Sequence, residues 1–147
     1  MNDKKDKKTG AVLVQGAGIA GVQASLDLAN SGFKVYLVER DGAIGGMMSH
    51  LDKTFPTGDC ATCIVSPKLV ECARNLNIKI LTMSELKYLE GEPGNFQASV
   101  KRYPRYVDED KCTGCSECTQ ACPVDIPDYF DSNMGTRKAI AKHYAQA

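Results

Sequence analysis

The sequence has no excess of charge of either sign. Its 147 residues carry 18 lysines and arginines against 18 aspartates and glutamates, so the formal net charge at pH 7 is zero. Binding to nucleic acid through its phosphates depends on a basic field, and a solvating tail depends on a block of acidic residues. The charge pattern therefore argues against nucleic acid as a partner and against an acidic tail.

Long hydrophobic runs are also missing. The apolar stretches are far shorter than the roughly 20 residues that span a bilayer, so we expect no direct membrane span. Residues 1–9 are almost all charged or polar, unlike the apolar core of a signal peptide, and we interpret them as a disordered tail. Seven cysteines without a secretion signal indicate a reducing compartment, the cytoplasm, where thiols bind metal rather than pair as disulfides.

Histidine is scarce, and the side-chain patterns of hydrolases are absent. The chain has two histidines, His50 and His143, and neither has an evident partner in the sequence. We interpret both as incidental. No Ser/His/Asp pattern and no pair of spaced carboxylates indicates hydrolysis.

Four cysteines and a proline form a compact motif near the end of the chain: Cys112, Cys115, Cys118, Cys122 and Pro123. Their spacing, C-x-x-C-x-x-C-x-x-x-C-P, is that of bacterial ferredoxins, in which the fourth cysteine usually binds a second cluster. Zinc sites instead pair one C-x-x-C with a distant second pair. The motif therefore predicts a [4Fe–4S] cluster and electron transfer.

The first third of the chain has the element order of a Rossmann-like βαβ unit. A short apolar strand is expected at residues 10–15, followed by the motif G-x-G-x-x-G at residues 16–21. A mostly apolar helix then runs to a stop signal at residues 30–32. A second strand is expected at residues 33–38. Because strand, glycines, helix and strand occur in this order, the segment predicts dinucleotide binding.

Each residue of the glycine motif has a physical role in that prediction. Gly16 permits a tight turn, Gly18 lets backbone amides approach a pyrophosphate, and Gly21 lets the helix pack against the strand. Ile19 and Ala20 lie at the helix N-terminus, where free amides and the helix dipole favour a phosphate.

The stretch after the second strand favours FAD over NAD. Glu39 follows the last glycine of the motif by 18 positions, near the interval expected of a ribose-binding acid, and its charge disfavours the 2′-phosphate of NADP. Arg40, Gly45, Gly46 and Met47 come next. Together with Glu39 they resemble the E-[KR]-x-x-x-x-G-G segment of two-dinucleotide-domain flavoproteins, in which the paired glycines let the chain pass close to FAD.

Three cysteines lie outside the ferredoxin motif: Cys60, Cys63 and Cys72. Ser66 and Pro67 supply an N-cap and a first-turn proline, so the sequence predicts a helix over residues 68–75, with the first two cysteines in the preceding loop.

Three interpretations of these cysteines stay open. They could be ligands of a second iron–sulfur cluster, or buried cysteines that pack as small hydrophobes. Cys60 and Cys63 could also form a thioredoxin-like redox pair, although such a pair opens a helix after a strand, and residues 56–59 have the composition of a loop.

The remaining segments are less distinctive. A third strand is expected at residues 77–82, and a half-buried strand at residues 96–102 after a turn at residues 91–95. After Pro123 the chain is polar, and we expect no further strand.

The string D-x-x-F-P-T-x-D-C-x-x-C-x-x-x-P-K-L-V-E-C at residues 52–72 resembles the A subunit of heterodisulfide reductase, together with the related flavoproteins of quinone-interacting oxidoreductase complexes. Residues 92–96 and 105–109 fit the same family. The resemblance implies an α/β fold with the following parts: a partial thioredoxin-reductase-like FAD domain at residues 10–102, a ferredoxin-type [4Fe–4S] module at residues 103–135 and a C-terminal tail at residues 136–147.

The resemblance also implies a function. We expect a flavin and iron–sulfur electron-transfer subunit of an oxidoreductase complex, with FAD, at least one [4Fe–4S] cluster and other subunits as partners. The family has a later FAD segment and a second ferredoxin motif that are not found here, so we expect a truncated version. Two clusters held only by cysteine need about eight thiolates and seven are present, which leaves the fourth ligand of the first cluster open.

Two alternative functions remain compatible with the sequence. One is a non-enzymatic ferredoxin-like carrier on a Rossmann segment that no longer binds flavin. The other is a disulfide reductase that uses Cys60 and Cys63 directly.

Overall fold

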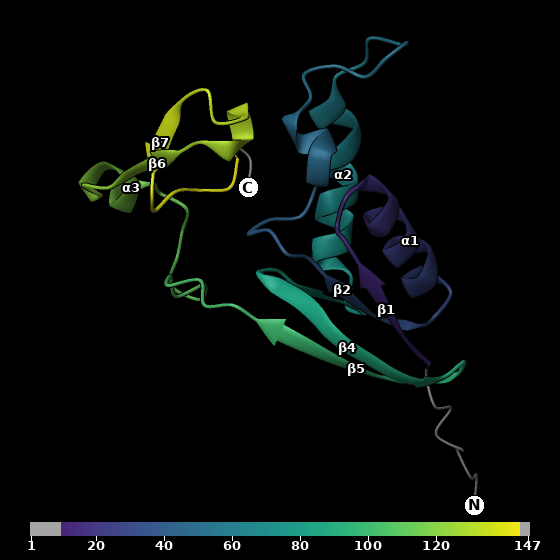
Figure 1. Ribbon diagram of the computed structural model, residues 1–147. Coiled ribbons are helices and arrows are strands. Elements are labelled where there is room, and N and C mark those ends of the chain that lie inside the picture. The colour runs from purple at the N-terminus through teal and green to yellow at the C-terminus, as the bar shows by residue number, and fades with distance from the viewer. Residues whose placement is uncertain (1–9, 145–147) are drawn as a thin grey trace, which may run out of the picture.

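The computed structural model describes residues 10–144. The tail predicted at residues 1–9 lies outside the described residues, as do residues 145–147. The described chain combines a parallel sheet with two helices, a long β-hairpin and a small cysteine-rich module (Figure 1). This arrangement confirms the α/β fold class.

The parallel sheet consists of three strands: β1 (Ala11–Gln15), β2 (Lys34–Val38) and β3 (Ile78–Leu81). Their order is β1-β2-β3, with Val14 opposite Leu37 and Leu37 opposite Ile80. Parallel neighbours need crossover connections, which two helices provide. All three strands were predicted, with ends that differ by one residue or less.

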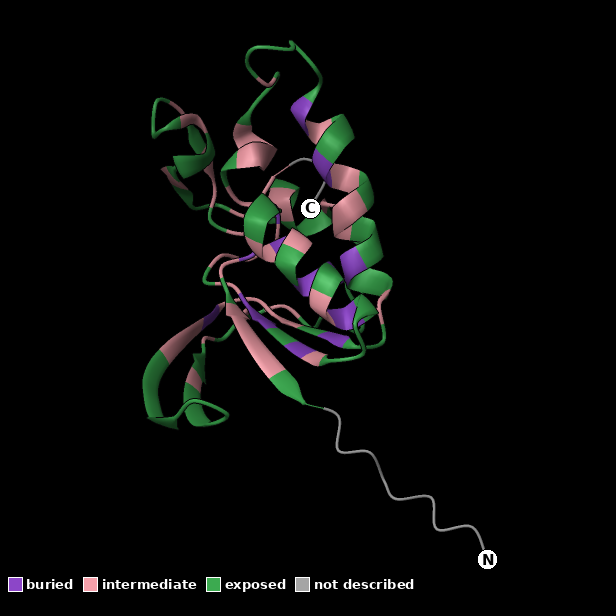
Figure 2. Ribbon diagram, turned by 90° about the vertical axis from the view of Figure 1, so that its right-hand side faces the viewer, coloured by how far each residue is buried: buried purple, intermediate pink, exposed green. Residues whose placement is uncertain are grey.

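Helices α1 (Ile19–Asn30) and α2 (Ala61–Arg74) cover one face of this sheet and contact each other (Figure 2). The core lies between the helices and the sheet and consists of these buried residues: Ala17, Val22, Leu26, Ala29, Val35, Leu37, Cys72 and Ile78. Burial of this apolar surface is the main force that holds the helices on the sheet.

Helix α2 begins earlier than predicted. Its N-cap is Cys60, and Pro67 lies inside the helix rather than in its first turn. Buried Ala61 and Val65 precede the proline and buried Cys72 follows it. Packing on both sides of Pro67 thus keeps the helix continuous, although a proline there removes one helical hydrogen bond.

Strands β4 (Ser84–Glu92) and β5 (Asn95–Arg102) form an antiparallel hairpin that extends away from the sheet (Figure 1). The turn between them contains Pro93 and Gly94, and Gly94 has φ of 92°, as the third position of a type II turn requires. The strand predicted at residues 96–102 is present, but the expectation that it is half-buried is wrong, because every residue of β5 except Val100 is exposed. Strand β4 was missed because most of its side chains are exposed and show no alternation of burial.

The cysteine-rich module contains these elements: α3 (Glu117–Ala121), β6 (Asp125–Pro127), a 3-10 helix η2 (Tyr129–Asp131) and β7 (Thr136–Lys138). Strands β6 and β7 pair antiparallel. The expectation of no strand after Pro123 is therefore wrong; strands of three residues are too short to show a sequence period. Within residues 10–144, no helix is long and apolar enough to cross a bilayer.

Candidate functional site

The glycine motif forms a tight loop between β1 and α1. Gly16 has φ of 92°, a conformation that side chains disfavour. A Cβ on Gly21 would stand only 1.8 Å from the carbonyl oxygen of Gly16, so no larger residue fits there. A Cβ on Gly18 would meet nothing within 4 Å. The first and third glycines are thus required by the fold, whereas the second faces open space.

The N-terminus of α1 carries backbone amides that precede the first hydrogen bond of the helix. The first hydrogen bond of the helix runs from the amide of Val22 to the carbonyl of Gly18 (2.9 Å), so the amides of Ile19, Ala20 and Gly21 lie before it. Gly18 is the N-cap and supplies no side-chain cap, and the first turn has no acidic residue. An anionic group such as a pyrophosphate suits this end of the helix.

Glu39 links the two loops at the ends of β1 and β2. Its Oε2 accepts a hydrogen bond from the amide of Ala17 at 2.6 Å, and its Oε1 accepts one from the amide of Asp41 at 3.0 Å. Each carboxylate oxygen can accept a further bond, so the side chain can still receive a ribose hydroxyl.

The turn with Gly45 and Gly46 lies against the glycine motif. The amide of Gly45 donates to the carbonyl of Ala17 at 2.8 Å. A Cβ on Gly46 would stand 2.8 Å from the Cα of Gly18, and both glycines have positive φ (127° and 57°). The paired glycines therefore bring this turn into backbone contact with the loop. Its neighbours Arg40 and Met47 are exposed.

A 3-10 helix, η1 (Gly46–His50), follows the paired glycines and faces the module. The ring of His50 stacks on Phe130, with centroids 4.4 Å apart, and its Nδ1 lies 3.2 Å from the Phe130 carbonyl oxygen. The hydroxyl of Tyr144 donates to the carbonyl of Ile44 at 2.6 Å. The module thus lies directly beside the turn that contacts the glycine motif.

A second histidine takes part in this contact region. Nδ1 of His143 lies 2.5 Å from the hydroxyl of Tyr129, and its ring contacts the ring of Tyr144. The interpretation of His50 and His143 as incidental is wrong. Phe130 lies 80 positions from His50, and Tyr144 lies 100 positions from Ile44. No local sequence signal could therefore have revealed these contacts.

Arg105 also joins the module to the first half of the chain. Its Nη2 donates to the carbonyl of Gly42 at 3.0 Å and to the hydroxyl of Thr82. Its Nε forms an ion pair with Oε1 of Glu109 at 2.5 Å. The guanidinium therefore fixes the connection between the hairpin and the cysteine motif.

The four cysteines of the ferredoxin motif are free thiols: Cys112, Cys115, Cys118 and Cys122. Hydrogen bonds from the backbone of Glu117 and the side chain of Thr113 lower the pKa of Cys115. Hydrogen bonds with the backbone of Ile140 and Val124 lower the pKa of Cys122. Backbone groups directed at thiolates are what a cluster-binding loop supplies to its sulfur ligands.

The backbone of the motif also suits a loop that wraps a cluster. Gly114 and Ser116 both have positive φ (70° and 69°), so the chain turns sharply between successive cysteines. Among residues 10–144, however, the structure does not gather three or more side chains of His, Cys, Asp or Glu closely enough to hold a metal ion. The donor set fits a [4Fe–4S] cluster in spacing and chemistry, and the identity of the fourth ligand stays a prediction.

The other three cysteines do not lie together in the structure. The expectation that the cysteines do not pair as disulfides is wrong for Cys60 and Cys63, which form a disulfide at the start of α2 with Cα atoms 5.2 Å apart. Cys72 lies nine residues further along the same helix, about 13 Å at the usual rise per residue. Its side chain is fully buried, and burial raises its pKa from 9.0 to about 11. The structure thus places Cys72 apart from the Cys60–Cys63 pair, and a second cluster held by these cysteines stays an untested alternative.

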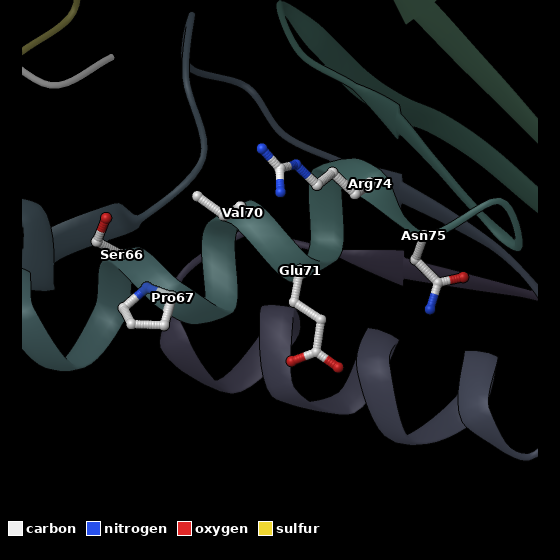
Figure 3. A pocket seen from close by; sticks show the side chains of 6 residues that line it. All are labelled: Ser66, Pro67, Val70, Glu71, Arg74 and Asn75. Atoms are coloured by element: carbon white, nitrogen blue, oxygen red, sulfur yellow. The ribbon is translucent and has the colours of Figure 1, made fainter.

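A shallow hollow lies elsewhere, on the outer side of α2. It is lined by residues that recur at helical spacing: Ser66, Pro67, Val70, Glu71, Arg74 and Asn75 (Figure 3). None of them is a predicted site residue. A second hollow is lined by Met83 and by residues of the connection that follows β5, from Tyr103 to Asp110.

Comparison with known proteins finds a family model for each of the two segments. Residues 11–59 match the family model described as FAD dependent oxidoreductase, and residues 105–128 match the 4Fe-4S binding domain. Among solved structures, L-proline dehydrogenase from P. horikoshii aligns with a TM-score of 0.53 over 66% of this chain and 20% of that chain. At 24% identity, this likeness concerns the fold alone.

Curated relatives match nearly the whole sequence. The A subunit of the H(2)/formate:CoB-CoM heterodisulfide,ferredoxin reductase of Methanococcus maripaludis is 53% identical over 92% of this chain and 20% of its own length. A protein of Archaeoglobus profundus that is named as similar to the A subunit of heterodisulfide reductase is 49% identical over 100% of this chain and 21% of its own. The chain thus spans about a fifth of the length of these relatives. Over that span it belongs to the family of heterodisulfide reductase A subunits.

Proposed function

We propose that this chain is the flavin and iron–sulfur part of an oxidoreductase complex of the heterodisulfide reductase type, and that it passes electrons between FAD and a [4Fe–4S] cluster. The observation that carries the proposal is the contact between its two halves. His50 stacks on Phe130, and Tyr144 donates to Ile44, next to the Gly45–Gly46 turn. These contacts hold Phe130 and Tyr144, which follow the cysteine motif in the chain, against the segment that contacts the glycine motif.

The residues that would hold FAD come from the two loops at the ends of β1 and β2: Gly16, Gly18, Ile19, Ala20, Gly21, Glu39, Arg40, Gly45, Gly46 and Met47. The open space at Gly18 and the N-terminus of α1, which has no side-chain cap, suit the pyrophosphate. Glu39 suits the ribose, because its carboxylate is already held in place by two backbone amides.

The cluster would be held by Cys112, Cys115 and Cys118, with Cys122 or a cysteine outside this sequence as the fourth ligand. When both groups are bound, FAD exchanges electrons in pairs and the cluster carries them singly. The chain itself orients the two groups and supplies hydrogen-bond partners to Cys115 and Cys122.

The partners follow from the relatives by analogy. The names of the relatives describe subunits that act on the CoB–CoM heterodisulfide and ferredoxin. We propose that this chain likewise works with other subunits of such a complex, in the cytoplasm, and that those subunits supply and accept its electrons. We also propose that the module extends beyond residue 135, because β7 pairs with β6.

A flavin-free carrier is not favoured. The loop at residues 16–21 keeps the space and the backbone donors that a dinucleotide needs, and residues 11–59 match an FAD-dependent family.

Two variants separate the two cofactors. Protein purified without oxygen should contain about four irons and one FAD per chain. Gly18→Ala should lose flavin and keep iron, whereas Cys118→Ser should lose iron and keep flavin. Reduced flavin in the unaltered protein should then reduce the cluster, measured by electron paramagnetic resonance. Zinc in place of iron, or flavin loss in both variants, would contradict the proposal.

A further inference from the structure

The disulfide of Cys60 and Cys63 has a chemical setting that the proposed electron path does not use. It joins the N-cap residue of α2 to a residue in the first turn of a helix of 14 residues. Neither family model covers the pair, because one ends at residue 59 and the other begins at residue 105. The pair is thus a second thiol site, separate from the ferredoxin motif.

The helix terminus favours a thiolate at Cys60. Its Sγ already accepts a hydrogen bond from the amide of Cys63 at 3.1 Å, as an N-cap side chain does. The first turn of α2 has no acidic side chain, so the positive end of the helix dipole is not neutralised there. Of the nearest charges along the chain, Asp59 opposes a thiolate and Lys53, whose backbone pairs with Cys60, favours it.

The pair is also accessible and held in place. Both residues are exposed, in contrast to the fully buried Cys72 of the same helix. The preceding loop is closed on itself, because the amide of Thr54 donates to the carbonyl of Asp59 at 2.8 Å and the amide of Ala61 donates to the carbonyl of Asp52 at 3.1 Å. A small thiol in solution can reach the disulfide without any opening of the core.

We propose that Cys60 and Cys63 form a redox-active dithiol/disulfide pair that exchanges with small-molecule thiols. A thiolate RS⁻ attacks Sγ of Cys63, an RS–S bond forms, the Cys60–Cys63 bond breaks, and Cys60 leaves as a thiolate at the helix N-terminus. A second RS⁻ attacks the mixed disulfide, RS–SR departs, and Cys63 leaves as a thiolate. Two thiols are oxidised, the pair gains two electrons, and the two thiol protons end on the cysteines.

Trypsin cleavage separates the three kinds of cysteine. Cys60 and Cys63 fall on residues 54–68, Cys72 falls on residues 69–74, and the ferredoxin cysteines fall on residues 112–137. The cofactor-loaded protein is equilibrated without oxygen in buffers of reduced and oxidised dithiothreitol, then alkylated with iodoacetamide, digested and measured by mass spectrometry. Peptide 54–68 should convert reversibly from an internal disulfide to a doubly alkylated form. Peptide 69–74 should stay unlabelled until the protein is denatured.

Two single variants test the roles within the pair. In Cys63→Ser, the remaining Cys60 should react with iodoacetamide at neutral pH about tenfold faster than Cys63 does in Cys60→Ser, because the helix N-terminus favours its thiolate. Serine caps helices well, which suits Cys60→Ser at the N-cap, and Cys63 is exposed, so both variants should fold. Both should keep the iron and flavin content of the unaltered protein, which separates this proposal from the electron path.

Three results would overturn the proposal. In the first, peptide 54–68 has the same form in all the buffers. In the second, its two cysteines are alkylated independently of each other instead of together. The third is loss of iron from either variant, which would make these residues cluster ligands. A failure of flavin to reduce the cluster would count only against the proposed function.

Discussion

The imidazole of His50 lies on the ring of Phe130, with ring centroids 4.4 Å apart, although 80 positions separate the two residues. His50 ends the short helix that follows Gly45 and Gly46, and Phe130 lies eight residues after the last cysteine of the ferredoxin motif. This stacked pair thus connects the segment that follows the glycine motif to the cysteine-rich module.

Replacing Phe130 by alanine should weaken the contact between the cysteine-rich module and η1. The stacked pair contributes about 0.5–1.5 kcal/mol beyond the area it buries. Amide hydrogen exchange should therefore become faster across residues 125–144 and in η1, with little change in β1 to β3. The matched control is Phe55→Ala, because Phe55 is 98% exposed. Equal exchange rates in both variants would show that the pair does not hold the module.

Replacing Gly18 by alanine should weaken FAD binding without harming the fold. The added methyl group meets no protein atom within 4 Å and the φ of Gly18 is ordinary (−70°), so it occupies only the space expected for the pyrophosphate. We expect at least about a tenfold loss of FAD affinity, about 1.4 kcal/mol.

The control is Gly42→Ala, whose Cβ would lie 3.9 Å from the sulfur of Met83. Fluorescence titration with FAD measures both variants, and thermal unfolding of the apoprotein checks their folds. An unchanged affinity in Gly18→Ala would place the pyrophosphate elsewhere.

Replacing Gly21 by alanine should damage the fold itself. The methyl group would stand 1.8 Å from the carbonyl oxygen of Gly16, so the helix and the loop must move apart. Overpacking of this kind costs about 1–3 kcal/mol or more. Chemical denaturation of the apoprotein should show a lower midpoint for Gly21→Ala than for Gly18→Ala. Equal midpoints would contradict the close approach of the loop to the helix.

Acid should weaken the contact between the two halves through His143. Burial lowers its pKa below the ordinary value of 6.5; His50 and Arg137 lower it further, whereas Asp41 and Glu39 raise it. The folded chain therefore disfavours the proton that the unfolded chain takes up below pH 6.5. The contribution of His143 to the free energy of unfolding should therefore fall as the pH decreases below 6.5. Above that pH it should stay constant.

His143→Gln removes the titrating group and tests this prediction. Its denaturation midpoint should depend less on pH than that of the unaltered protein between about pH 7.5 and about pH 5. The same pH dependence in both proteins would assign the effect to other groups.

Several features could be derived from the sequence because their signals are local. The glycine motif predicts the β1–α1 turn, since only glycine fits beside the Gly16 carbonyl and at the positive φ of Gly16 itself. The spacing of Cys112, Cys115 and Cys118 indicates a cluster without any structure, because a short loop carries most of its ligands. The apolar runs predicted the three parallel strands.

Other features depend on contacts between distant parts of the chain, and only the tertiary structure decided them. Helix α2 continues across Pro67 because its buried residues pack on α1 and the sheet. That longer helix places Cys60 and Cys63 at its N-terminus and Cys72 in the core, so three cysteines alike in the sequence become an accessible disulfide and a buried thiol. The roles of His50 and His143 are set by residues of the other half, because stacking and hydrogen bonding require proximity in space and not in sequence.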